Sequence, residues 1–510
     1  MCAVCVGRGP WAVGRGRAGG GYGRRVADQG VDAVVVGSGP NGLAAAVTLA
    51  RAGLEVLVLE ANDTVGGGAR TLDLGLADGI LHDVCSAVHP LAWASPFFRE
   101  LGLAERVELV VPEVSYAQPL DGGRAGLAFR DLSRTVESLG VDGPAWRGLF
   151  APLVDRWPDL VALTLSDKRH LPAGLLPGGV PTAVRLALAV LEQGTRRWQG
   201  SFRSEVGSAL LTGVAAHAST PLPSLAGAGT ALLLGTLAHA DGGWPLPRGG
   251  SQSIIDALRD ELAAHGGRVV TGHRVRTPGD LPRATAYLFD TTPRTFLDVF
   301  GARVPSGAAR ALAGFRYGNG AAKVDFVLGG PVPWANADVG RAGTVHVGGT
   351  RVQMATAEAS VAAGRHAERP MVLASDPAVH DPGRIAGGLR PLWTYAHVPA
   401  GSDVDVTDAV VAQVERFAPG FRDVVVASRC VPAAQLSSHN ANYIGGDIGA
   451  GAITPWQMVA RPTPWMNPYA TGVDGVYLCS ASTPPGPGVH GLSGWYAARH
   501  VLRKKFGSSG

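Results

Sequence analysis

A glycine-rich run near the N-terminus carries the clearest chemical signal of this 510-residue sequence. It reads Gly37-x-Gly39-x-x-Gly42 and stands between the apolar segment Val31–Val36 and the alanine-rich segment Leu43–Arg51. Between a strand and a helix, the first glycine permits a tight turn and the second lets the backbone approach a pyrophosphate. The third lets the helix pack closely on the strand. The run therefore predicts a dinucleotide site with the phosphates at the helix N-terminus.

An acid at the end of the next apolar segment completes the pattern. Glu55–Glu60 (EVLVLE) is typical of a second buried strand, and Glu60 is placed to accept hydrogen bonds from ribose hydroxyls. A carboxylate there would repel a 2′-phosphate, so NADP is disfavoured. We expect this part of the cofactor site to comprise Gly37, Ser38, Gly39, Asn41, Gly42 and Glu60.

A second glycine run, Gly66–Thr71 (GGGART), bears on which dinucleotide is bound. With Glu60 it resembles the Glu-x5-Gly-Gly extension of flavoproteins in the amine oxidase and phytoene desaturase superfamily. In that family the loop lies along the FAD diphosphate, and the arginine after it contacts the flavin. The resemblance implies cofactor roles for Gly67, Gly68 and Arg70, and a guanidinium can neutralise a diphosphate or a reduced, anionic flavin. A surface salt bridge is the alternative for Arg70.

The resemblance covers nearly the whole chain, from about residue 31 to 503. His82–Pro90 and Pro247–Ser251 are similar to family segments, and the segment ending at Val275 resembles the strand whose backbone contacts adenine. Val476–Thr483 and Pro485–Gly491 resemble the family's C-terminal flavin segment. The further residues implied to bind FAD are Val275, Ser482, Thr483, Gly488 and Val489.

Two positions depart from the family pattern, because Ser480 stands where glycine is usual and Pro487 interrupts the last glycine run. The most similar subgroup is that of the phytoene desaturase-like proteins, which includes one named for a pyridine nucleotide-disulfide oxidoreductase domain. The predicted folded part has no paired redox cysteines, and a second Gly-x-Gly-x-x-Gly run is missing, so a bound NADPH domain is not expected.

Two residues are the candidates for catalysis. Lys323 lies in an apolar strand, and in related amine oxidases a lysine holds a water near the flavin; the alternative is a strand-edge charge paired with Asp325. His490 lies in the predicted flavin loop and either contacts the ring or stabilises the loop. Trp393, Tyr395 and His397 alternate on one strand face and either line a cavity or fill the core.

Loop residues around His439–Asp447 are expected to face the substrate, with Asp447 more typical of a turn cap than of a catalyst. No spacing of His, Cys and acids suggests a metal site.

The elements indicate an α/β protein: a discontinuous Rossmann-like FAD-binding domain with a second domain of mixed sheet and helices. We expect a basic disordered leader (1–30), FAD-binding parts at 31–107, 244–300 and 466–506, a mostly helical substrate region (108–243) and a substrate-domain sheet (301–465). The uncharged segment Pro223–Ala240 predicts a buried helix rather than a membrane span.

Composition narrows the function classes. The net charge is +4, and the first 30 residues alone account for it, so a nucleic-acid-binding domain is not expected. Five scattered cysteines fit a reducing cytoplasm.

The leading hypothesis is an FAD-dependent oxidoreductase, a desaturase, dehydrogenase or isomerase, acting on a small apolar substrate such as an isoprenoid or polyene. A flavin amine oxidase and a flavin-holding regulatory protein are the alternatives. Peripheral membrane contact and the oligomeric state stay open.

Overall fold

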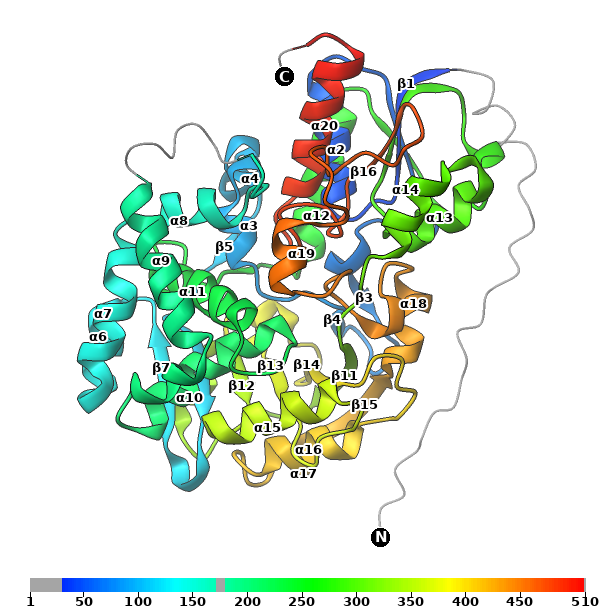
Figure 1. Ribbon diagram of the computed structural model, residues 1–510. Helices are drawn as coiled ribbons and strands as arrows, with labels where there is room; N and C mark the ends of the chain where they lie inside the picture. The colour runs from blue at the N-terminus through cyan, green and yellow to red at the C-terminus, as the bar shows by residue number, and fades with distance from the viewer. Residues whose placement is uncertain (1–29, 171–178, 509–510) are drawn as a thin grey trace.

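The computed structural model describes residues 30–170 and 179–508 and divides into two layered regions (Figure 1). The predicted leader, apart from Gly30, lies outside the described residues. One region is built on a five-stranded sheet and the other on a seven-stranded sheet.

The first sheet is wholly parallel and has the strand order β16-β10-β1-β2-β9. Its strands are β1 (Val31–Val36), β2 (Val56–Leu59), β9 (Arg268–Val270), β10 (Ala284–Phe289) and β16 (Val476–Leu478). Three distant stretches of the chain therefore meet in one sheet. The expected fold class, with a discontinuous Rossmann-like domain, is confirmed.

Helices cover both faces of this sheet. Ala33 and Val35 of β1 pack beneath α2 (Pro40–Arg51), α12 (Gln252–Ala264) and α20 (Leu492–Lys505). Val34 and Val36 face α13 (Pro293–Phe300) and α14 (Ser306–Ala313). Burial on both faces explains why the strand reads as an unbroken β-branched run rather than as an alternating one.

The second sheet is mixed and has the order β15-β11-β14-β13-β12-β6-β7. It comprises β6 (Val114–Pro119), β7 (Ala125–Phe129), β11 (Gly320–Leu328), β12 (Ala342–Val347), β13 (Val372–Ser375), β14 (Arg390–Val398) and β15 (Val425–Val431). One face packs on α7 (Gly143–Val154), α9 (Val180–Gln193), α10 (Glu205–Ala215) and α11 (Leu225–His239). The other packs on α16 (Thr407–Glu415) and α17 (Phe421–Val424).

Three expectations about elements can be compared with this architecture. The uncharged segment forms the mostly buried helix α11, as predicted. The region 108–243 is less purely helical than expected, because β6 and β7 join the second sheet. The strand expected to end at Val275 ends at Val270 instead, because Gly272 takes a positive φ of 68° and the backbone N–H groups of Gly272 and His273 turn to donate to the carbonyl oxygens of Asn62 and Glu60.

Candidate functional site

The first glycine run forms a cradle at the carboxyl end of β1. Gly39 precedes α2, which starts at Pro40, and Gly39 has no side chain that could cap the first N–H groups of the helix. A Cβ at Gly42 would lie 2.2 Å from the carbonyl oxygen of Gly37, so only glycine fits this turn. A helix N-terminus that opens onto a cavity suits a diphosphate.

The acid predicted to bind ribose lies in this cradle. Glu60 is buried, and its Oε2 accepts hydrogen bonds from the Ser38 hydroxyl at 2.6 Å and the Ser38 N–H at 3.0 Å. Its Oε1 accepts from the backbone and side-chain N–H groups of Asn62 at 2.8 and 2.9 Å. Glu60 therefore ties the glycine loop to the end of β2, and it lines the same cavity as Gly37, Ser38, Gly39 and Asn41.

A second acid of the cradle escaped the sequence analysis. Asp290 follows β10, the neighbour of β1, and its Oδ2 accepts a hydrogen bond from the Gly42 N–H at 2.9 Å. The same oxygen would lie 2.7 Å from a Cβ at Gly39, which explains why that position is a glycine. Burial raises the pKa of Asp290 to about 8. The sequence signal was an acid directly after a buried apolar strand.

The second glycine run packs tightly against the first. A Cβ at Gly67 would lie 2.9 Å from the Gly39 Cα, and a Cβ at Gly68 would lie 2.1 Å from the Tyr443 hydroxyl. Both glycines line the cavity, whereas Arg70 is not among the lining residues. The Arg70 guanidinium instead donates to the carbonyl oxygen of His439 at 2.8 Å. The structure thus gives Arg70 an internal contact, and its cofactor role stays a prediction.

The C-terminal flavin segment contributes mainly backbone. Gly488 and Val489 line the cavity, as does Val275 from the loop after β9. The hydroxyls of Ser482 and Thr483 are buried and donate to the carbonyl oxygens of Ala450 and Ser480, at 2.7 and 2.8 Å. These two side chains therefore shape the segment from within.

The two catalytic candidates lie outside the set of cavity-lining residues. His490 is buried, its Nδ1 accepts from the Leu492 N–H at 3.0 Å, and its Nε2 lies 3.0 Å from the Gly486 carbonyl oxygen. These contacts match the alternative in which His490 stabilises the loop. Burial lowers its pKa to about 4.

Lys323 forms a buried ion pair with Asp325, and its ammonium lies 5.4 Å from the centre of the Trp393 ring. The expectation of a strand-edge charge is wrong, because β11 lies between β15 and β14 and bonds to both. A catalytic role for Lys323 stays a prediction that the geometry does not support.

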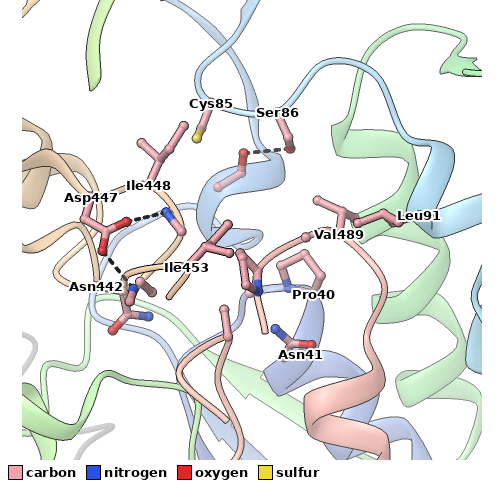
Figure 2. A pocket seen from close by; sticks show the side chains of 18 of the residues that line it. Pro40, Asn41, Cys85, Ser86, Leu91, Asn442, Asp447, Ile448, Ile453 and Val489 are labelled. Atoms are coloured by element: carbon pink, nitrogen blue, oxygen red, sulfur yellow. Dashed lines mark hydrogen bonds between the residues drawn. The ribbon is translucent and has the colours of Figure 1, made fainter. Parts of the chain in front are cut away.

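One continuous cavity of about 940 Å³ joins the cradle to the second domain. Figure 2 shows Pro40 and Asn41 at the start of α2, with Val489, Leu91 and Ile453 around the same space. Such a volume lies at the upper end of the usual range for ligand sites, about 300–1,000 Å³. The cradle therefore fits a dinucleotide, and the cavity continues beyond it.

The loop expected to face the substrate does reach this cavity, where Asn440, Asn442 and Tyr443 line it. Asp447 also lines it, but its carboxylate accepts from the N–H groups of Gly318, Gly449 and Gly451, at 2.7 to 2.9 Å. Asp447 is thus a turn cap, as the sequence favoured (Figure 2). Trp393 and Tyr395 line the cavity, whereas His397 lies behind them.

Two cations also line the cavity near the C-terminal segment. The Lys168 ammonium donates to the Ser166 carbonyl oxygen at 2.9 Å, and burial lowers its pKa to about 8. Arg461 is buried, its Nε has no partner among the described residues, and burial lowers its pKa to about 10. Apart from the rarity of lysine, no sequence pattern pointed to either residue.

This geometry defines a class of protein: one with a cradle suited to a dinucleotide on a Rossmann-like sheet, next to a cavity that continues to a second, mixed sheet. A family model described as flavin-containing amine oxidoreductase matches residues 41–277. Pyridine nucleotide-disulfide oxidoreductase domain-containing protein 2 of Rattus norvegicus is 26% identical, over 92% of this chain and 93% of its own length. Flavin-containing amine oxidase B of Sus scrofa is 34% identical over 27% of this chain and 29% of its own.

Solved structures share the fold. An oxidoreductase from Methanosarcina mazei has a TM-score of 0.53 at 16% identity, covering 93% of this chain and 100% of its own. Putrescine oxidase has a TM-score of 0.56 at 17% identity, with coverage of 93% and 100%. The chain is thus similar to flavin-containing amine oxidoreductases over residues 41–277, and its cofactor is FAD. Its phytoene desaturase-like character stays a prediction.

Proposed function

We propose that this oxidoreductase removes a hydride from a carbon atom of an apolar substrate, with FAD as the two-electron acceptor. The observation that carries the proposal is the wall of the cavity beyond the cofactor cradle. Helices α8 (Trp157–Thr164), α9, α11 and α19 (Pro455–Val459) line it. Apart from Thr164 and Thr230, the larger side chains that these helices contribute are apolar, and so is the neighbouring Leu165. The apolar side chains include Leu163, Leu165, Leu186, Val190, Leu233, Leu234, Met458 and Val459.

The acids of the cavity support an uncharged substrate. Glu60, Asp290 and Asp447 are its lining carboxylates among the described residues, and each accepts hydrogen bonds from backbone N–H groups. An ammonium group would need a carboxylate with free lone pairs, because an unpaired buried charge is costly. The cavity offers apolar surface more readily than a cation site.

An amine oxidase is the second candidate, and one observation favours it. Five Phe, Trp or Tyr side chains of the described residues line the cavity: Trp244, Phe289, Trp393, Tyr395 and Tyr443. Trp393 and Tyr395 meet edge-on, with ring centres 5.2 Å apart. Aromatic faces of this kind attract amine cations. The relatives support an enzyme rather than a flavin-holding regulatory protein.

Anaerobic reduction of the bound FAD separates the candidates. The protein would be mixed with a soluble polyene, or with an amine of equal size such as decylamine, and bleaching of the visible flavin band would be followed. Reduction by apolar substrates but not by the amine is the expected result. Reduction by the amine alone would contradict the proposal and establish the second candidate.

We propose a lipid surface as the source of this substrate. Helix α9 lines the cavity through Leu186 and Val190, while Val184, Leu188 and Leu191 are exposed. The exposed Arg185, Arg196 and Arg197 lie on or just after the same helix and suit anionic headgroups. Among the described residues, no helix is long and apolar enough to span a bilayer.

A further inference from the structure

A serine on the wall of the cavity has an unusual backbone and an unusual neighbour. Ser219 follows the short 3₁₀ helix Ala216–Ala218 and adopts φ 48° and ψ 43°, a left-handed conformation that costs a non-glycine residue energy. The side-chain amide of Asn319 donates to its carbonyl oxygen at 3.0 Å and fixes this turn. Both residues line the cavity.

The hydroxyl of Ser219 is backed by two buried side chains. Its Oγ lies 3.4 Å from Nε2 of His397, and Nδ1 of His397 lies 2.5 Å from Oε1 of Glu358. His397 and Glu358 are almost wholly buried. The Tyr395 ring stacks on the imidazole with a centre-to-centre distance of 5.7 Å, which fixes the ring's orientation. A serine, histidine and glutamate thus stand in line, and the serine faces the cavity.

The contacts assign the protons of this line. A carboxylate only accepts hydrogen bonds, so the proton between His397 and Glu358 belongs on Nδ1 of the histidine. Nε2 is then bare and accepts a hydrogen bond from the Ser219 hydroxyl. This arrangement equips Nε2 to take a proton, with the nearby carboxylate stabilising the imidazolium that results.

A second histidine pair lies beside the serine and stays uncharged. His217 lines the cavity, and its Nε2 lies 2.8 Å from Nε2 of His346. Burial lowers the pKa of His217 to about 3. The groups that act electrostatically on this corner are therefore His217, His346, His397 and Glu358, and the first two carry no charge at neutral pH.

We propose that Ser219, His397 and Glu358 form a proton relay, which makes the substrate an alcohol with an apolar body. This inference rests on the proposed function and narrows its substrate class. The substrate hydroxyl gives its proton to Ser219 Oγ as the Ser219 proton passes to His397 Nε2. The carbon–oxygen double bond forms while the carbon–hydrogen bond breaks and its electron pair leaves as hydride to FAD. His397 ends as an imidazolium beside Glu358, and Ser219 ends as it began.

The first test needs no substrate. A decyl fluorophosphonate would be added to the FAD-loaded protein, and the modified residue would be found by mass spectrometry. Label on Ser219 is expected, since its oxygen displaces fluoride as its proton moves to His397. His397→Asn, which keeps an amide toward Glu358, should abolish the label, and Glu358→Gln should reduce it. Absence of label on Ser219 of the wild type would overturn the relay.

The surface supplies an internal control for this labelling. The hydroxyl of Ser402 lies 2.8 Å from Nε2 of His366, and the described residues form no ion pair with that imidazole. Both residues lie outside the cavity-lining set. Label on Ser402 equal to that on Ser219 would show reactivity without a relay and would also overturn the proposal.

The second test follows anaerobic reduction of FAD by decanol. Ser219→Ala and His397→Asn should slow it by about 100-fold or more, the usual contribution of a general base. They should also flatten its pH dependence, whereas Ser402→Ala should match the wild type. No reduction by decanol, or equal rates in Ser219→Ala, would overturn the proposal.

Two further outcomes separate this inference from its rivals. Hydrolysis of nitrophenyl decanoate that depends on Ser219 would make the serine a hydrolytic nucleophile and overturn its oxidative role. Reduction by a polyene or by decylamine, unaffected by Ser219→Ala, would overturn the relay and leave flavin oxidation intact. Failure of the protein to bind FAD would refute the proposed function, while labelling would still decide whether Ser219 is activated.

Discussion

Replacing Lys323 by Met tests a buried ion pair in a central strand of the second sheet. The Lys323 and Asp325 side chains are 5% and 3% exposed, and the strand that carries them bonds to a neighbour on each side. Removing the ammonium leaves the Asp325 carboxylate buried, with His82 Nδ1 3.6 Å from its Oδ1. Breaking a buried pair in this way costs about 3–5 kcal/mol. A strand-edge pair would have cost less than about 1 kcal/mol.

The assay is urea unfolding followed by tryptophan fluorescence and by release of FAD. Lys323→Met should lower the free energy of unfolding by about 3–5 kcal/mol, the cost of a broken buried pair. The double variant Lys323→Met with Asp325→Leu should recover most of this loss. That recovery is expected because a buried ion pair can often be replaced by packed apolar side chains at little cost. FAD content at low temperature should match the wild type.

Two results would refute this reasoning. A loss below about 1 kcal/mol would mean that solvent reaches the pair despite its central strand. Unchanged stability together with slower flavin reduction would instead place the Lys323 ammonium at the reaction. That outcome would restore the catalytic role suggested by the related amine oxidases.

Three other changes test the cofactor cradle and the lipid surface. Glu60→Ala should weaken FAD binding by about 1–3 kcal/mol in equilibrium titration, while Asp63→Asn, an exposed acid nearby, should not. Asp290→Asn should reduce the pH dependence of the free energy of unfolding. The pKa of Asp290 rises from 3.8 to about 8 on folding, so the wild type loses stability relative to the variant as pH rises from about 4 to 8. A parallel pH profile would show that Asp290 ionises normally. Leu188→Glu should reduce sedimentation with anionic vesicles, whereas Val352→Glu, at an exposed site on α15 (Arg351–Ala362), should leave it unchanged.

The sequence predicts the cofactor domain well because its signals are local. Val31–Val36 forms β1 with the expected bounds, and the glycines of the first run meet the close contacts that their positions require. These features depend on neighbours within a few residues and on the shared geometry of a strand, a turn and a helix. The order of the strands in a sheet does not depend on such local features. The position of Lys323 within its sheet could therefore not be predicted.

The rest of the site depends on contacts between distant parts of the chain. Asp290 bonds to Gly42 across 248 positions, and Ser219 meets His397 across 178. No periodicity or spacing records such pairs. Arg70 shows the converse: its position in a motif was visible, but the direction of its guanidinium depends on His439.

The two ends of the cavity have different roles, one in holding the cofactor and the other in contacting the substrate. At the cofactor end the carboxylates of Glu60, Asp290 and Asp447 are held by backbone N–H groups, so they build loops and have little capacity left to select a substrate. At the far wall, the hydroxyl of Ser219 faces the cavity with His397 behind it. Substitutions at the cofactor end should therefore change the protein's affinity for FAD by the same amount whichever substrate is assayed. Changes at the far wall should alter which substrate is oxidised and at what pH, with FAD still bound.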